Sequence, residues 1–238
     1  MRFAMADAFS TTRWTLLAAA ARDDTAANDA LAELCQVYWR PVYAYIRRHG
    51  HTPEDSADLA QSFFLHLLEH RAFGRADPAR GRFRAYLVTA ARNFLLNAQA
   101  RASTVSRGTR WKHDSIDAID AEHHLALTAT DLESSPEAIF ERQWALRVIE
   151  RALERLKQDY VDRDQGHVFD ELRPFLTSNA PGSLGNSGMD QKSDAFRAAL
   201  YRGRRRFAEA LREEIHTTVE HVEDVEDELR YLLVVLSK

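Results

Sequence analysis

The chain has 238 residues, of which 45% are hydrophobic and 29% are charged, and its formal net charge is −4. This composition excludes an intrinsically disordered protein, and the length fits two small domains better than one. The single cysteine, Cys35, excludes an intrachain disulfide and a cysteine-based metal site. No run is long enough to span a bilayer, and the short apolar run 14–21 predicts a capped helix and not a signal peptide. We therefore expect a cytoplasmic protein that contacts no membrane.

Apolar residues recur at helical spacing along most of the chain and strand patterns are almost absent, which predicts an all-α fold. Ser10 or Thr11 can cap a first helix. A second helix is expected to bend or break near Pro41, and Thr52 followed by Pro53 is typical of the start of a third. Gly74, Pro78 and Gly81 predict a loop over residues 73–83. The expected helices of this half after the first one run over about residues 26–49, 53–70 and 84–102.

The second half begins after a change in composition. Residues 103–135 lose the helical period and are rich in Ser, Thr, Asp and His, which predicts a flexible acidic linker with room for a short helical piece. Ser135 and Pro136 restart a helix. Residues 179–188 are rich in Gly, Ser and Asn, a composition that predicts an interruption between helices. Further helices are expected over 168–176, from Ser193 or Asp194 to about Glu214, and in the acidic-then-apolar tail. We interpret the chain as a domain over 1–102, the linker 103–135, a domain over 136–215 and an extension over 216–238.

The modest net charge conceals a strong separation of charge along the chain. Arginines gather in two places, with acids concentrated in 114–133 and 213–228. Each cluster is either an ordinary solvated helix face or a patch that contacts phosphate. The first cluster comprises Arg75, Arg80, Arg82, Arg84, Arg92, Arg101, Arg107 and Arg110, with Asp77 as its one acid. The second comprises Arg197, Arg202, Arg204, Arg205 and Arg206.

The helix over 58–70 carries a wide apolar stripe flanked by polar residues. Such a stripe is either part of the core or a surface that docks a partner helix. The candidate docking residues are Asp58, Gln61, Phe64, Leu67 and Leu68.

The same helix contains a metal-site string. His66, Glu69 and His70 match the H-x-x-E-H pattern of some zinc peptidases, in which two histidines bind metal and the glutamate is the general base. No third ligand can be singled out. A metal-dependent hydrolase is therefore a remote alternative, and we predict no cofactor, no metal and no enzymatic activity.

The segment after the first arginine-rich loop combines cations, aromatic rings and amides. Arginines can bind phosphate, Phe83 and Tyr86 can stack on bases, and Asn93 and Asn97 lie one helical turn apart on one face. Amides can hydrogen-bond base edges, although exposed asparagines on a helix often have no role. The candidate DNA-binding residues here are Arg82, Arg84, Tyr86, Arg92, Asn93 and Asn97.

The second arginine cluster lies on a predicted helix whose apolar residues face a core. A basic helix preceded by a turn fits the second helix of a helix-turn-helix. The segment before it, APGSLGNSGMD, has little to pack and a low helical propensity. The candidate DNA-binding residues of this domain are Arg197, Arg202, Arg204, Arg205 and Arg206.

Taken in order, these segments resemble the extracytoplasmic-function (ECF) sigma factors of bacterial RNA polymerase, in a subgroup with a C-terminal extension. The strings that carry the resemblance are YWRPVYAYIRRHG, DLAQSFFLHLLE, ADPARGRFRAYLVTAARNFLLN and SPEAIFERQWAL. The resemblance implies a promoter-specificity subunit that binds core polymerase, melts promoter DNA and directs initiation. Its partners would be the β′ clamp helices, the β flap, promoter DNA and, in some systems, an anti-sigma protein.

By this resemblance the first domain is similar to sigma domain two. The helix with Asp58 and Gln61 would dock on the β′ clamp helices, and the loop 73–83 would form a pocket for a flipped base of the minus-ten element. Asn93 and Asn97 match polar base-contacting positions. The linker would thread toward the polymerase active-site cleft, and the second domain would grip the β flap and read the minus-thirty-five element.

The second domain departs from the family pattern. Where the family has an apolar helix before its recognition helix, residues 182–190 contain three glycines. Weak DNA binding, folding only on polymerase, and positioning by another protein all stay open. A sigma-like adaptor or decoy that reads no promoter is therefore an alternative. The tail over 220–236 either folds over Arg202–Arg206 and restrains DNA binding, or completes the core of the second domain.

Overall fold

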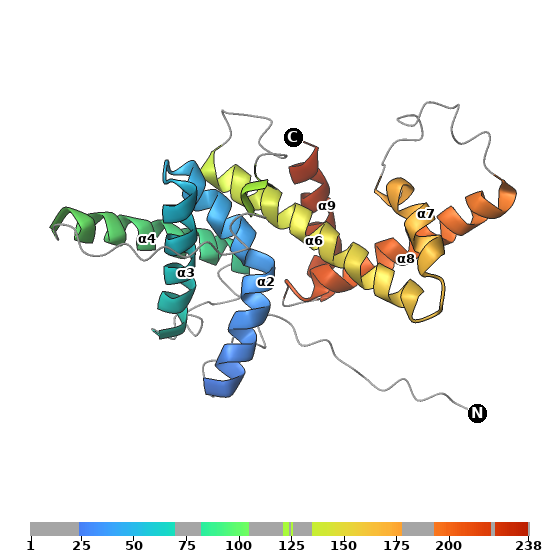
Figure 1. Ribbon diagram of the computed structural model, residues 1–238, viewed down its shortest axis with the longest axis horizontal. Helices are drawn as coiled ribbons and strands as arrows, with labels where there is room; N and C mark the ends of the chain where they lie inside the picture. The colour runs from blue at the N-terminus through green and yellow to red at the C-terminus, as the bar shows by residue number, and fades with distance from the viewer. Residues whose placement is uncertain are drawn as a thin grey trace. The chain divides into compact units, whose positions relative to one another are not determined.

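The computed structural model describes residues 24–69, 82–104, 121–123, 125, 135–177, 193–219 and 222–237. Within these ranges the regular elements are all helices, which confirms the all-α prediction (Figure 1). None of these helices is both long and apolar enough to cross a membrane. The elements are α2 (Asp24–Arg48), α3 (Pro53–Glu69), α4 (Phe83–Thr104), α6 (Pro136–Val161), α7 (Gly166–Leu176), α8 (Asp194–His216), the short 3-10 helix η3 (Val222–Asp224) and α9 (Val225–Leu236).

Three helix starts follow the capping residues in the sequence. The hydroxyls of Thr52, Ser135 and Ser193 accept hydrogen bonds from the backbone N–H three residues later, at 3.1, 3.2 and 3.2 Å. These bonds satisfy donors that the first turn of a helix leaves without a partner. Pro53 and Pro136 are the first residues of α3 and α6, as predicted. The cap expected at Ser10 or Thr11 lies outside the described residues.

The chain divides into two compact units, one formed by residues 1–146 together with 216–238 and the other by residues 147–215. α6 begins in the first unit and continues into the second. The sequence-based domains follow the chain, whereas this division groups the tail with the first helices.

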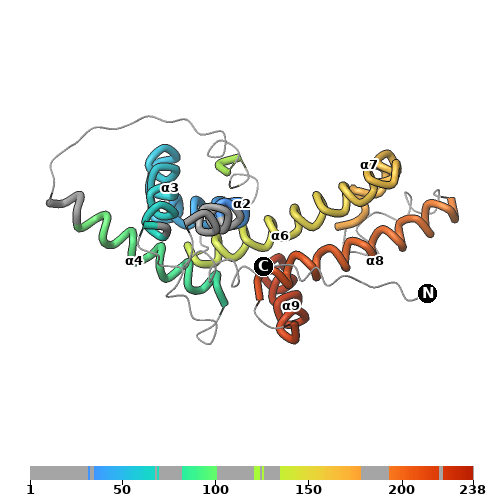
Figure 2. The backbone as a smooth tube through the Cα atoms, turned by 90° about the horizontal axis from the view of Figure 1, so that it is seen from below, coloured from blue at the N-terminus to red at the C-terminus, as the bar shows by residue number. Residues whose placement is uncertain are grey.

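The core of the first unit is built on α2 and α3, which lie side by side in both views (Figures 1 and 2). α2 continues as one helix past Pro41, where a bend or break was expected. α4 adds a row of buried residues at helical spacing, and α6 and α9 add further apolar side chains. The buried residues include Tyr38, Val42, Ile46, Ala60, Phe63, Phe83, Leu87, Leu95, Phe140, Trp144 and Leu232.

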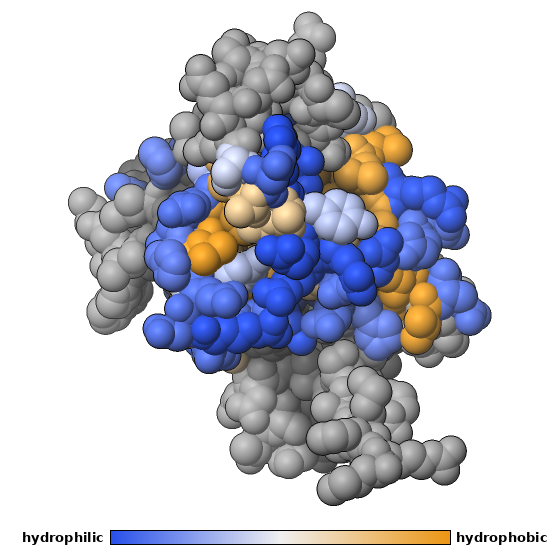
Figure 3. Space-filling model, turned by 90° about the vertical axis from the view of Figure 1, so that its right-hand side faces the viewer, coloured by the Kyte–Doolittle hydropathy of each residue, from blue (hydrophilic) through white to orange (hydrophobic). Residues whose placement is uncertain are grey.

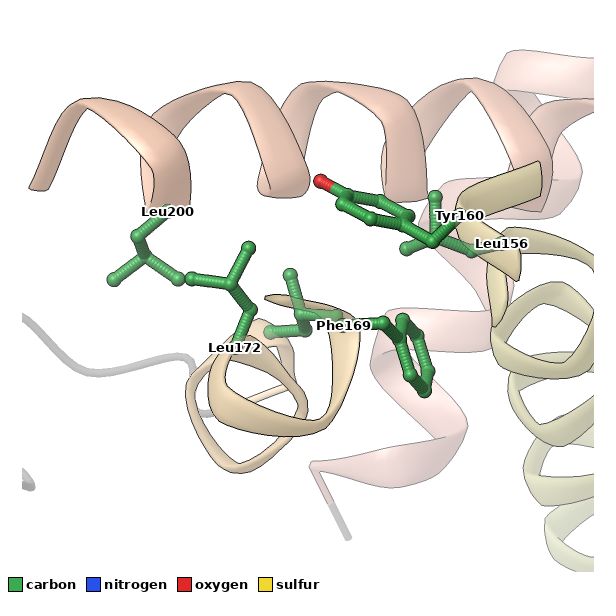
Figure 4. Packing of buried hydrophobic residues seen from close by; sticks show 6 residues of the cluster. Leu156, Tyr160, Phe169, Leu172 and Leu200 are labelled. Carbon is green, nitrogen blue, oxygen red and sulfur yellow. The ribbon is translucent and has the colours of Figure 1, made fainter. Parts of the chain in front are cut away.

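The second unit packs the C-terminal half of α6 against α7 and α8. Its core joins Leu156 and Tyr160 of α6 to Phe169 and Leu172 of α7 and to Leu200 of α8 (Figure 4). Gly203 of α8 lies so close to α7 that an added Cβ would stand 3.2 Å from Leu172 Cδ1. The absence of a side chain there lets the two helices approach closely. The glycine-rich segment 179–188, predicted to break structure, lies outside the described residues.

Candidate functional site

The predicted docking helix, α3, separates buried from exposed residues along its length. Phe64 and Leu67 are buried, and the Phe64 ring lies 6.3 Å from that of Trp39. Asp58 and Gln61 are exposed. The apolar pair therefore packs in the core of this structure, and of the predicted docking residues Asp58 and Gln61 lie at the surface. The side chain of Leu68 lies outside the described residues.

One exposed residue of α3, Leu65, is absent from the predicted docking residues. Leu65 is 46% exposed and follows Asp58 and Gln61 at spacings of seven and four residues, so the three lie on one face of the helix. The helical spacing from Asp58 could have identified it. An exposed leucine between polar neighbours gives this face an apolar contact point that the buried stripe does not provide.

A groove of about 320 Å³ runs between α3 and α4 beside this face. Leu59, Leu95 and Ala98 give its lining apolar side chains, and Asp55 and Asp58 add carboxylates. The groove is thus suited to a long side chain with an apolar stem and a positive end.

The metal-site string does not assemble in the described part of the chain. The ring of His66 packs 5.6 Å from that of Phe94, and His70 lies outside the described residues. Among the residues that the structure describes, no group of three His, Cys, Asp or Glu side chains could hold a metal ion. His66 therefore has a packing role, and the geometry gives no support to a hydrolase.

The middle of α4 presents the predicted base-reading residues to solvent. Arg92, Asn93 and Asn97 are all exposed. Tyr86 is half-buried and its ring stacks on Phe83 at 6.0 Å. Phe83 itself is buried, so of these two aromatic residues only Tyr86 retains surface for a base. The loop 73–82 that precedes this helix lies outside the described residues except for Arg82.

The start of α4 has a very different environment. Arg84 is 5% exposed and its guanidinium forms ion pairs with Glu141 of α6, at 2.7 Å, and with Glu228 of α9. The same guanidinium lies 4.4 Å from the ring centres of both Trp144 and Tyr231. Two carboxylates and two aromatic faces therefore surround one arginine, as cation–π and charge pairing both favour.

Arg82, the residue before α4, contacts two of the same residues, Glu228 and Tyr231. Its side chain is 42% exposed, pairs with Glu228 at 2.9 Å and lies 5.1 Å from the ring centre of Tyr231. Glu228 is 1% exposed, so one buried carboxylate serves two arginines. Burial lowers the pKa of Arg84, and burial raises that of Glu141 while Arg84 opposes the rise.

Arg84 is enclosed and cannot reach a phosphate in this arrangement, and Arg82 is only partly available. The tail contacts Arg82 and Arg84, a contact that neither of the two sequence-based alternatives for the tail included. Nothing in the local sequence identifies Glu228 and Tyr231 as partners of residues more than 140 positions away.

The basic helix α8 uses several of its arginines within the second unit. Arg204 donates to the carbonyl oxygen of Phe175 at 3.0 and 3.2 Å, where α7 is ending, and Arg206 lies over the ring of Tyr160 at 5.3 Å. Arg205 pairs with Glu209 one turn away. Figure 3 shows a face on which the described residues are mostly hydrophilic and the hydrophobic ones form small groups. Of the five predicted residues, Arg197, Arg202, Arg204 and Arg205 are exposed and Arg206 is half-buried.

The described part of the linker is docked on the first unit. Glu122 accepts hydrogen bonds from Arg47 at 2.8 and 3.0 Å and from the hydroxyl of Tyr43 at 2.6 Å, while Ala121 is buried beside Ala57. The bonds from Arg47 lower the pKa of Glu122 despite its partial burial. Burial and Glu122 together raise the pKa of Tyr43 well above its ordinary value. This part of the linker is therefore held on α2 by a charged pair, whereas the sequence suggested a free tether.

Comparison with known families identifies one match. Residues 34–104 match the Sigma-70 region 2 family, a range that includes all of α3 and α4 and most of α2. No curated protein and no solved structure gives a significant match. The matched range contains Asp58, Gln61, Asn93 and Asn97, so the exposed faces of α3 and α4 both fall within it.

Proposed function

We propose that the protein is a promoter-specificity subunit of bacterial RNA polymerase, of the ECF sigma type. The observation that carries the proposal is the Sigma-70 region 2 match, which coincides with helices that expose two separate polar faces. One face is acidic with an apolar point, and the other carries amides and a cation. A subunit that links an enzyme to melted DNA needs two such faces on one rigid support.

The face of α3 is the proposed polymerase-docking surface. Asp58 and Gln61 can form hydrogen bonds to a partner helix, and Leu65 supplies an apolar contact between them and the end of the helix. We assign the β′ clamp helices as the partner, because the family uses this helix in that way. The second unit is the proposed partner of the β flap.

The face of α4 is the proposed minus-ten surface. Arg92 can bind a phosphate, and the amides of Asn93 and Asn97 can bind the edges of unpaired bases. Capture of flipped bases would offset the unstacking cost of a few kcal/mol per step. Strand opening needs only binding energy, so the proposed role is regulatory and non-enzymatic.

An adaptor that binds polymerase without reading a promoter is the second candidate. It is favoured by the engagement of Arg82 and Arg84 with α9 and of Arg204 and Arg206 within the second unit. In that case the protein would bind core polymerase but would direct no transcription.

Run-off transcription from a genomic-fragment library, with purified protein and bacterial core polymerase, tests the proposal. Defined start sites that share a minus-ten motif are expected. Asn93→Ala with Asn97→Ala should abolish promoter opening and leave polymerase binding intact, since neither side chain belongs to the docking face. Gln158→Ala is the control, because it removes an exposed amide of α6 that belongs to neither proposed face.

Asp58→Lys is the reciprocal variant and should lose polymerase binding in a pull-down. Polymerase binding without transcripts from the wild-type protein would establish the adaptor. Loss of polymerase binding in the asparagine double variant would contradict the assignment of the two faces.

A further inference from the structure

The buried pairing between α4 and α9 has the chemistry of a nucleic-acid contact. Glu228 and Tyr231 lie three residues apart, on one face of α9, and both meet the same two arginines. A carboxylate that accepts two guanidinium groups resembles a phosphate, and a ring stacked on guanidinium resembles a base. α9 thus presents to Arg82 and Arg84 the two groups that single-stranded DNA would present.

We propose that α9 is a built-in competitor of DNA, a lock that keeps Arg82 and Arg84 from phosphate until the helix leaves. The proposal rests on the proposed function for the identity of the ligand. It adds that the C-terminal helix controls access to the N-terminal end of the DNA-contacting helix.

The way α9 is attached suits a helix that can leave. It has twelve residues, and helices this short are marginal on their own. Val225, Glu228 and Leu232 are its buried residues, whereas Leu233 and Val234 are about half exposed. Leu229, Tyr231, Val235 and Leu236 are half-buried, so α9 is attached by one apolar face together with the two ion pairs of Glu228. Polyanions and salt compete with ion pairs of this kind.

The arrangement also limits the cost of opening. When α9 leaves, Arg84 keeps its ion pair with Glu141 of α6, so no buried cation is left without a counter-charge. Glu228 moves from a buried site into water, where hydration replaces the ion pairs that it loses. Arg82, already partly exposed, becomes fully available. Departure of α9 therefore uncovers both arginines, while Arg84 keeps Glu141 as its partner.

The first test uses the wild-type chain. Hydrogen exchange of the α9 amides is measured with and without fluorescein-labelled, mixed-sequence single-stranded DNA. Because two ligands that exclude each other must weaken each other reciprocally, bound DNA should accelerate exchange over residues 225–236. Unchanged or slower exchange in the DNA complex would overturn the lock.

The second test removes the two side chains of α9 that resemble DNA. Glu228→Gln with Tyr231→Ala should bind the same DNA more tightly, and its slope of log affinity against log salt should steepen by about 0.7, the share of one freed arginine, because Arg84 keeps its ion pair with Glu141. Glu223→Gln is the matched control, since it removes one charge from an exposed site without contact to either arginine. An unchanged slope in the double variant would contradict the proposal. Addition of Arg82→Ala to the double variant should return most of this gain.

These outcomes are separate from those of the proposed function. DNA binding and hydrogen exchange need no polymerase, so a protein that fails to bind core enzyme can still show or lack the lock. If the double variant does not fold, as judged by its helical circular dichroism, the exchange experiment on the wild-type chain decides.

Discussion

Arg84 and Arg205 both lie in arginine-rich runs, and their surroundings in the folded chain are opposite. The side chain of Arg84 is 5% exposed among two carboxylates and two rings. That of Arg205 is 75% exposed and pairs with Glu209 across one turn of its own helix. Equal charge in the sequence therefore says little about whether an arginine is available to a ligand.

A third pair falls between these extremes. Arg47 and Glu122 are 24% and 36% exposed and join through two parallel hydrogen bonds. Since water screens exposed charges and burial removes both their hydration and the screening, the consequence of breaking a pair should follow this order. The three pairs thus form a graded series within one chain.

The largest effect is expected at the buried pair. Arg84→Met should lower the free energy of unfolding by about 3–5 kcal/mol, because it leaves Glu141 and Glu228 buried without their shared cation. Urea denaturation followed by helical circular dichroism measures the change. Arg82→Met is the control and should have a clearly smaller effect, since that side chain is partly in water. Equal losses in the two variants would show that burial does not govern this cluster.

A smaller effect is expected at the half-buried pair. Glu122→Gln should cost about 1–2 kcal/mol, as expected for a charge-assisted pair that is partly screened. Because Arg47 lowers the folded-state pKa of Glu122 below its ordinary value of 4.5, the pair contributes fully above that value and is lost as pH falls through the lowered pKa. Hydrogen exchange at residues 121–123 should therefore accelerate only in that acidic window. Acceleration that begins near neutral pH would contradict this assignment.

The smallest effect on stability is expected at the exposed pair. Arg205→Ala should change the free energy of unfolding by less than about 0.5 kcal/mol, since exposed pairs one helical turn apart contribute little. If α8 contacts DNA, the same variant should weaken duplex binding and reduce the salt slope by about 0.9. A large loss of stability would mean that this arginine has a structural role that its exposure does not suggest.

Many element boundaries could be predicted because their causes are local. Thr52, Ser135 and Ser193 form cap bonds with residues only three positions away, and Pro53 occupies a first helical position for which its ring is suited. The apolar period likewise predicted that α3 would bury one face. It did not separate core from docking surface, because Phe64 and Leu67 are buried by helices that the local pattern does not contain.

The helical class, the helix starts and the face shared by Asn93 and Asn97 could be predicted, since these depend on residues within one or two turns. The contacts of Glu228 and Tyr231 with Arg82 and Arg84 could not be predicted, because they depend on how distant helices pack. The sequence does not show whether an arginine side chain will be hydrated by water, bind a phosphate or pair with a carboxylate from a distant helix. Packing chooses among these, because burial of charge is tolerated only where a partner arrives with it.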